Sequence, residues 1–242
     1  MERNLSPDKG GIIGRTYRIP SQSSAMKRSI TCEIEAGGVT LPGILEIPPK
    51  PVGLVVFAHG SGSSRFSPRN VLVSQELHRA SIATLLLDLL TQAEDISFER
   101  RFDIELLASR VASAVRWARG QPPTQALRVG LFGASTGAAA ALRVAASDPQ
   151  IACVVSRGGR PDLAGTLYLS RVRAPTMLIV GGRDAEVIEL NRMAFEELSC
   201  ERSMQIVAGA THLFEEPGAL ERVAAISRDW FAKHFETQRA ET

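Results

Sequence analysis

The chain has 242 residues, of which 44% are hydrophobic and 22% are charged, and its formal net charge is +2. This composition is typical of a soluble globular protein with a sizeable core, and it excludes a disordered or fibrous chain. A net charge this small creates no field that would attract nucleic acid or an anionic membrane, so we expect neither as a partner.

Residues 1–26 are rich in Ser, Gly and basic residues and have no sustained hydrophobic period, so we expect a poorly ordered tail before a domain at 27–242. They contain no apolar leader segment, and we expect no membrane span. Cys32, Cys153 and Cys200 are far apart and lack C-x-x-C spacing, which argues against a disulfide framework and against zinc. We therefore expect a cytoplasmic protein without a metal or a cofactor.

Residues 28–48 predict a β-hairpin, since Gly37 and Gly38 tolerate the positive φ angles of a tight turn. Continuous apolar runs follow, typical of strands buried on both faces of a parallel sheet. These runs occupy residues 53–59, 81–90, 127–133, 151–156, 175–182 and 203–210. Between them, helical periodicity joins apolar residues, namely Ile104, Leu107, Val111, Val115 and Ala118, and later Leu220, Val223, Ile226 and Trp230.

This alternation predicts one α/β domain, in which a mostly parallel central sheet carries helices on both faces. The longest connection without an obvious element, residues 157–173, is too short to hold a large lid. We therefore expect an open site at the strand ends, where chemistry gathers in α/β sheets.

The motif Gly133-Ala134-Ser135-Thr136-Gly137 interrupts a strand and is followed directly by an alanine-rich helix. Small residues permit a sharp strand-to-helix turn that exposes the Ser135 hydroxyl near a helix N-terminus, as in the nucleophile elbow of G-x-S-x-G hydrolases. The alternative is a structural serine that caps a glycine-flanked helix.

A serine nucleophile needs a base, and only His212 and His234 follow Ser135 in the sequence. His234 lies within the last amphipathic helix, where a packed or solvated histidine is the ordinary interpretation. His212 lies on the loop between the last predicted strand and that helix. We predict that His212 is the base.

An orienting carboxylate is expected on a loop after an intervening strand. Asp184 fits because it follows the run at 175–182, with a helix cap as its structural alternative. Asp162 is the main competitor, and Asp148 lies at the far end of its helix.

An oxyanion hole commonly uses the N–H after the nucleophile and another from an early loop. Thr136 supplies the first, and Ser61, in the stretch FAHGSGSSR, is the expected second, with Gly62 next. The stretch lacks the G-K-[ST] ending of a phosphate loop, and Arg65 stands where the last glycine of G-x-G-x-x-G would be. We expect His59 to stiffen this loop by hydrogen bonds.

Together these stretches resemble the dienelactone-hydrolase-like branch of the α/β-hydrolase superfamily, over about residues 28–236. The stretches are FAHGSGSSRFSPRN, LFGASTGAAAAL, VVSRGGRPDLAG, LIVGGRDAEV and ATHLFEEPGALERVAAISRDWF. The resemblance implies an α/β-hydrolase fold with Ser135 as nucleophile, Asp184 as acid and His212 as base, and an oxyanion hole at Ser61 and Thr136. The enzymes that named the family use a cysteine nucleophile, so Ser135 favours general ester hydrolysis. Similar sequences also occur fused to a phosphoribosyltransferase domain, and that reaction is not carried over.

Several arginines lie near predicted strand ends, namely Arg65, Arg69, Arg157, Arg160 and Arg183. One hypothesis is that an arginine, Arg65 or Arg157 above the others, binds the carboxylate of an anionic substrate at the pocket rim. Gly62 is a further candidate for substrate binding. The alternative is that these arginines form ordinary salt bridges and helix caps.

The leading functional prediction is a serine carboxylesterase that cleaves small to medium acyl esters through an acyl-enzyme. The same residues could instead cleave a thioester, a lactone or a peptide amide. A third interpretation is a hydrolase-shaped interaction module without catalysis. We expect a monomer or a homodimer.

Overall fold

The computed structural model describes Met1 and residues 27–236. The N-terminal tail expected at residues 1–26 falls, apart from Met1, outside the described residues. The hairpin, the alternating strands and helices and all the candidate site residues fall inside them.

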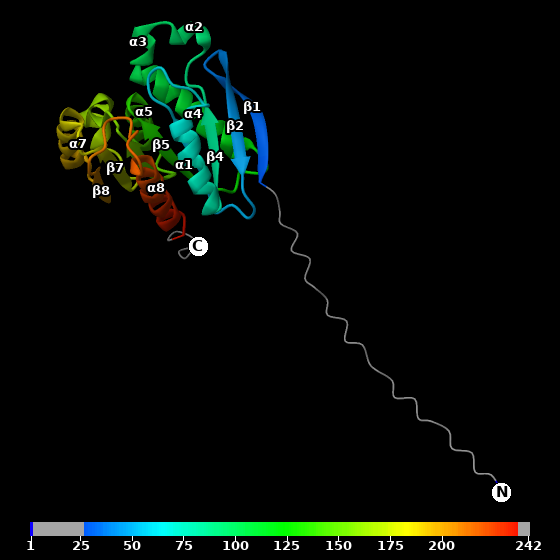
Figure 1. The fold of residues 1–242 in the computed structure, drawn as a ribbon. Helices are drawn as coiled ribbons and strands as arrows, with labels where there is room; N and C mark the ends of the chain where they lie inside the picture. The colour runs from blue at the N-terminus through cyan, green and yellow to red at the C-terminus, as the bar shows by residue number, and fades with distance from the viewer. Residues whose placement is uncertain (2–26, 237–242) are drawn as a thin grey trace.

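An eight-stranded sheet forms the centre of the molecule, with the strand order β1-β2-β4-β3-β5-β6-β7-β8 (Figure 1). Its strands are β1 (Arg28–Ala36), β2 (Val39–Ile47), β3 (Gly53–Ala58), β4 (Ile82–Leu87), β5 (Val129–Ala134), β6 (Ile151–Arg157), β7 (Thr176–Gly181) and β8 (Arg202–Val207). The pairs β1–β2 and β2–β4 are antiparallel, and all other neighbouring pairs are parallel. The predicted fold class, a single α/β domain with a mostly parallel sheet, is confirmed.

The predicted hairpin is the pair β1–β2 at one edge of the sheet. Gly37 and Gly38 form its turn with φ angles of 60° and 84°, which is the left-handed backbone that this tight turn requires. Because β2 pairs with β4 and not with β3, the hairpin extends the sheet away from the strands that carry the candidate site.

Strands β3 to β7 are buried along their whole length, as the continuous apolar runs predict. The last run differs from the prediction. β8 is the opposite edge strand, and only Val207 among its residues is buried. An edge strand has one neighbour and is only partly covered, so a run that includes Met204 and Ile206 does not establish burial on both faces.

Helices cover both faces of the sheet (Figure 1). Side chains from α4 (Ile104–Gly120), α5 (Thr136–Ser147) and α7 (Ala185–Glu197) join the core on one face, and those from α1 (Pro68–Arg79) and α8 (Ala219–Glu236) join the core on the other. The short elements are α2 (Gln92–Asp95), α3 (Phe98–Arg101), the 3-10 helix η1 (Pro161–Ala164) and α6 (Thr166–Leu169). Within residues 27–236, no helix combines the length and the apolar character needed to cross a bilayer.

Helix α8 lies unusually close to the sheet because glycines face it. A Cβ atom on Gly53 would lie 2.5 Å from the ring of Phe235, and one on Gly130 would lie 2.8 Å from the ring of Phe231. Both rings are fully buried. Helix α8 therefore packs on the face of β3 and β5 that is opposite to the face covered by α4 and α5.

The carboxyl ends of β3, β5, β6 and β7 reach the same edge of the sheet, because these strands are parallel. The loops after β3, β5 and β7 hold Ser61, Ser135 and Asp184, and His212 follows the neighbouring β8. Arg157 is the last residue of β6. The topology therefore brings residues from five segments of the chain to one end of the molecule.

Candidate active site

Ser135 occupies a strained turn between β5 and α5. Its φ is 49° and its ψ is −123°, which is a backbone conformation that side-chain-bearing residues rarely adopt. The turn is held from the next strand. The Ser135 N–H donates to the Arg157 carbonyl at 3.3 Å, and the Ser135 carbonyl accepts from the Arg160 N–H at 3.1 Å. The Ser135 hydroxyl makes no cap hydrogen bond to α5, so the helix-cap alternative is wrong.

The two glycines of the motif are required by close approach. A Cβ on Gly133 would lie 2.4 Å from the Ala138 Cα, and one on Gly137 would lie 2.2 Å from the Ala58 carbonyl oxygen. Because Gly133 has no Cβ, α5 can fold back tightly over β5. Because Gly137 has no Cβ, the start of α5 can pack against the end of β3, which brings the motif around Ser135 to the predicted oxyanion loop.

His212 and Asp184 are joined by a hydrogen bond of 2.7 Å between the histidine Nδ1 and the carboxylate Oδ2. Asp184 stands at the start of α7 without capping that helix through its side chain, so its structural alternative does not hold. Since Nδ1 faces the carboxylate, Nε2 is the ring nitrogen left for a second partner.

The loop that carries His212 is fixed by a residue that the sequence did not single out. The Glu216 carboxylate accepts the Thr211 N–H with both oxygens, at 3.1 and 3.0 Å. These hydrogen bonds stabilise the charged carboxylate and lower the pKa of Glu216. Thr211 and Glu216 are five residues apart, and this spacing matches no motif that would predict the contact from the sequence.

Ser135 and His212 line the same cavity of about 170 Å³. The other lining residues are Gly60, Ser61, Ser63, Arg69, Ala134, Arg157 and Leu213. Within the described residues no hydrogen bond joins the Ser135 hydroxyl to His212, and catalytic contacts of this kind commonly tighten only in the complex with substrate. The shared cavity and the hydrogen bond therefore bring an alcohol, an imidazole and a carboxylate together at one site.

The competing acids and the other histidine are engaged elsewhere. Asp162 binds the Arg160 guanidinium with both oxygens, at 2.9 and 2.8 Å. Asp148 binds Arg119 at 2.6 Å. His234 is buried in α8 against the ring of Trp230, with ring centroids 4.5 Å apart, as expected for a packed histidine.

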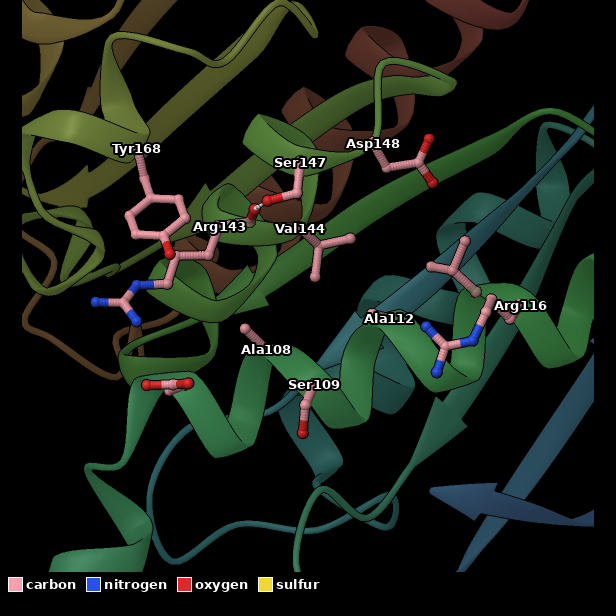
Figure 2. A pocket seen from close by; sticks show the side chains of 11 residues that line it. Ala108, Ser109, Ala112, Arg116, Arg143, Val144, Ser147, Asp148 and Tyr168 are labelled. Atoms are coloured by element: carbon pink, nitrogen blue, oxygen red, sulfur yellow. Dashed lines mark hydrogen bonds between the residues drawn. The ribbon is translucent and has the colours of Figure 1, made fainter. Parts of the chain in front are cut away.

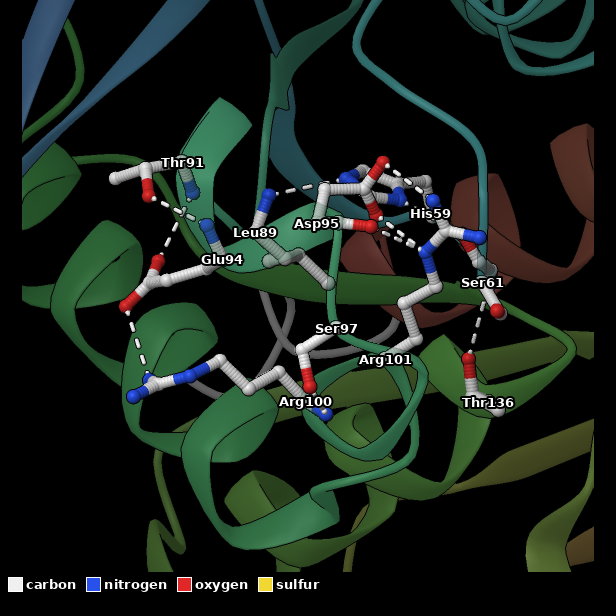
Figure 3. Close-up of polar contacts among 11 residues, drawn as sticks. His59, Ser61, Leu89, Thr91, Glu94, Asp95, Ser97, Arg100, Arg101 and Thr136 are labelled. Carbon is white, nitrogen blue, oxygen red and sulfur yellow. Dashed lines mark hydrogen bonds and ion pairs between the residues drawn. The ribbon is translucent and has the colours of Figure 1, made fainter.

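The predicted oxyanion donors lie next to each other and already share a contact. The Ser61 N–H donates to the Thr136 hydroxyl at 3.1 Å (Figure 3). The Thr136 N–H stands in the first turn of α5, where N–H groups lack a partner within the helix. Gly62 does not line the cavity of Ser135 but a narrow neighbouring pocket that also includes Arg101.

His59 holds the predicted oxyanion loop to the loop after β4, as expected from the sequence. Its Nδ1 lies 2.9 Å from the Gly60 carbonyl, and its Nε2 accepts the Leu89 N–H at 2.9 Å (Figure 3). This arrangement requires the neutral imidazole with the proton on Nδ1. Burial lowers the pKa of His59, which is consistent with that state.

The arginines near the strand ends have different surroundings. Arg65 binds Asp88 through its guanidinium and through its backbone N–H, so its charge is balanced. Arg160 is balanced by Asp162. Arg157 lines the cavity beside Ser135, with no hydrogen bond or ion pair to its guanidinium among the described residues.

A larger cavity, of about 410 Å³, lies between α4, α5 and α6 (Figure 2). Ala108, Ala112 and Val144 lie along it, with Arg143 stacked on the ring of Tyr168 at 4.7 Å. It lies on the side of the helices and away from the strand ends, and its lining includes no nucleophile beside a histidine. In the described part of the chain, no cluster of three or more His, Cys, Asp or Glu side chains could hold a metal ion.

Comparison with known proteins shows the family of the chain. Residues 78–239 match the family model described as the dienelactone hydrolase family. The chain belongs to this family. A crystal structure of a dienelactone hydrolase from Anabaena variabilis is 51% identical, covers 86% of this chain and 98% of its own, and superimposes with a TM-score of 0.83.

Further comparisons concern the fold and the sequence. The esterase Est1E from Butyrivibrio proteoclasticus, at 14% identity and a TM-score of 0.73, shares the fold over 84% of this chain and 98% of its own. Two Mycobacterium tuberculosis proteins named as phosphoribosyl transferases are 56% identical over 205 residues. Those residues are 84% of this chain but 46% of each relative, so the chain spans about half the length of these relatives.

The glycine contacts predict the effect of a single methyl group at the turn. In Gly137→Ala the new Cβ meets the Ala58 carbonyl oxygen, so we expect the free energy of unfolding to fall by about 1–3 kcal/mol. Gly120→Ala is the control, because a Cβ there has no neighbour within 4 Å. Urea unfolding of both variants tests this expectation, and equal stability would contradict it.

The burial of neutral His59 predicts a dependence of stability on pH. Its pKa is lowered in the folded protein, so below about pH 6.5 the unfolded chain binds more protons and stability falls. His59→Gln keeps one donor and one acceptor without the titration. Between pH 6.5 and 5 we expect its unfolding free energy to fall less steeply than in the parent, by up to about 1.4 kcal/mol per pH unit. Equal slopes would show that His59 is not held neutral.

Proposed function

We propose that this member of the dienelactone hydrolase family is a serine hydrolase that cleaves carboxylic esters. The observation that carries the proposal is the hydrogen bond between His212 and Asp184, in a site where His212 and Ser135 line one cavity. A structural serine or histidine has no need of this combination of an exposed turn, an oriented imidazole and a carboxylate.

In the proposed reaction the Ser135 hydroxyl attacks the ester carbonyl while His212 Nε2 accepts the hydroxyl proton. Asp184 holds the ring with Nδ1 protonated and stabilises the imidazolium that forms. The tetrahedral intermediate collapses, and His212 returns the proton to the leaving alcohol. Water then attacks the acyl-enzyme by the same route in reverse and releases the acid.

The negative charge of the intermediate is stabilised by the N–H groups of Thr136 and Ser61. The Ser61 N–H must exchange its bond to the Thr136 hydroxyl, or share it, to reach the substrate oxygen. The Thr136 side chain is buried. We infer that its hydroxyl keeps the Ser61 N–H directed toward the site before substrate binds.

A small or medium acyl group suits this site. The cavity at Ser135 is about 170 Å³, and the segment between β4 and α4 contains only the four-residue helices α2 and α3. A small cavity beside short surface helices offers little cover for a long acyl chain.

A lactone is the second candidate substrate, favoured by the 51% identity to a protein named dienelactone hydrolase. A cyclic ester would react by the same steps, except that the alcohol remains attached to the released acid. The proposal thus covers open and cyclic esters through one nucleophile, and a comparison of the two rates would rank them.

Labelling with a fluorophosphonate tests the nucleophile directly, because the reagent traps an activated serine. We expect labelling of the parent at Ser135, together with hydrolysis of short p-nitrophenyl esters, and loss of both in Ser135→Ala by at least about 1000-fold in kcat. Ser147→Ala, at the exposed end of the same helix, is the matched control. Equal labelling and turnover in the parent and Ser135→Ala would exclude the proposal.

Two substitutions of Thr136 test the orientation of the oxyanion loop. Thr136→Val removes the acceptor of the Ser61 N–H at nearly constant volume, and we expect kcat to fall about 10-fold because the donor is no longer held in place. Thr136→Ser keeps the hydroxyl and should retain most of the activity. If the valine variant turns over esters as fast as the parent, the side chain has no role in the oxyanion hole.

A further inference from the structure

A second cavity, of about 650 Å³, adjoins the cavity of Ser135 and is the larger of the two. We call it the Phe66 cleft. Its lining comes from β2, from the loop between β3 and α1, and from residues 88–95 after β4. Ser63 lines both cavities, and the narrow pocket at Gly62 shares lining residues with each of them. The Phe66 cleft and the cavity of Ser135 are therefore neighbours along the predicted oxyanion loop.

An ester that reacts at Ser135 has an acyl part and an alcohol part, and both need room. The two parts leave the carbonyl carbon on different sides, because the carbonyl group is planar. The cavity of about 170 Å³ at Ser135 holds one small part. The other part can extend past Ser63 into the Phe66 cleft, whose volume lies in the range of about 300–1,000 Å³ that is usual for small-molecule sites. This step rests on the proposed ester hydrolysis for the identity of the reaction.

The charges of the Phe66 cleft are balanced within the protein. Two carboxylates line it, those of Asp88 and Asp95. The Arg65 guanidinium binds Asp88, and Arg101 binds both carboxylate oxygens of Asp95, at 3.0 and 3.2 Å (Figure 3). The cleft therefore attracts neither an anion nor a cation, although each paired carboxylate still has lone pairs that can accept hydrogen bonds.

The rest of the lining combines hydroxyl-binding groups with one aromatic ring. Side chains that can both donate and accept hydrogen bonds are those of Thr40, Ser63, Ser64, Thr91 and Gln92. The ring of Phe66 is 60% exposed, although the Arg65 guanidinium lies 4.2 Å from its centroid. The face of such a ring is electron-rich and attracts C–H groups that carry a partial positive charge, as those of a sugar ring do.

We propose that the Phe66 cleft binds the alcohol part of the substrate and that this alcohol is a neutral sugar. Sugar hydroxyls donate and accept at once, which matches the paired carboxylates and the hydroxyl and amide side chains of the lining. The C–H face of the ring would pack on Phe66. A long acyl chain fits this cleft poorly, because an apolar chain would remove water from these polar groups without replacing its hydrogen bonds. The products would be a short carboxylic acid and the free sugar.

Two acetate esters of matched shape test this proposal. Methyl 6-O-acetyl-α-D-glucopyranoside and cyclohexylmethyl acetate both carry a six-membered ring on the CH₂ group of the ester, and only the first has hydroxyl groups. Titration of the released acetic acid at constant pH gives kcat/KM for each. We expect the parent protein to favour the sugar ester by at least about 10-fold, through several neutral hydrogen bonds.

Substitutions in the lining test where this preference arises. Phe66→Ala removes the ring, and we expect the preference to fall about 3- to 10-fold. Gln92→Met keeps the size of the side chain without its hydrogen bonds, and we expect a fall of about 3-fold. Both side chains are exposed, so neither change opens the core. Phe66→Tyr keeps the ring and should retain the preference. Phe98→Ala is the matched control, because Phe98 is 72% exposed on α3 and does not line the cleft.

Sugar binding without turnover separates this inference from the proposed function. Saturation-transfer NMR of Ser135→Ala with methyl α-D-glucopyranoside should show contact with the sugar protons, and Phe66→Ala in that background should weaken it. Such binding in a protein whose parent hydrolyses no ester would support the sugar site and overturn the proposed hydrolysis. Equal kcat/KM for the two acetates in an active parent would overturn the sugar site and leave the hydrolase intact. A preference that survives both Phe66→Ala and Gln92→Met would overturn the assignment to this cleft.

Discussion

The candidate site depends on one strained residue that is held in place by a neighbouring strand. A positive φ at Ser135 is unfavourable by about 1–3 kcal/mol, and the local sequence alone offers nothing to compensate for it. The turn after β6 does so, because Arg157 and Arg160 bind the backbone of Ser135 on both sides. The position of the nucleophile is therefore a tertiary property, set by the pairing of β5 with β6.

The same turn connects the nucleophile to the helix that follows the acid. Asn191, fully buried on α7, donates its side-chain amide to the Gly159 carbonyl at 2.9 Å and to the Val187 carbonyl at 2.8 Å. Since α7 begins directly after Asp184, one buried amide links the acid's helix to the turn around Ser135. These hydrogen bonds hold the helix after the proposed acid against the turn that supports the proposed nucleophile, although the two are distant in sequence. Supporting contacts of this kind hold functional groups in productive geometry.

Most of the fold and the central residues of the site could be predicted from the sequence because short-range patterns encode them. Apolar runs defined the buried strands, and the small residues around Ser135 identified the turn. The partners of Arg65 and of the Ser61 N–H could not be predicted, because Asp88 and Thr136 are far away in the chain and only the folded sheet brings them close. The four-residue helices α2 and α3 were also missed, since they are too short for a hydrophobic period and begin at polar caps.

The arginines of the described residues differ in how their charge is balanced. Arg65 is paired with Asp88, and the deeply buried Arg110 is paired with Glu94. Arg157 is also deeply buried, and no acidic side chain among the described residues pairs with it, so its burial lowers the stability of the fold. Because Arg157 pairs in register with Ala134 and its carbonyl accepts the Ser135 N–H, this unfavourable burial lies at the strand end that also holds the turn of the proposed nucleophile.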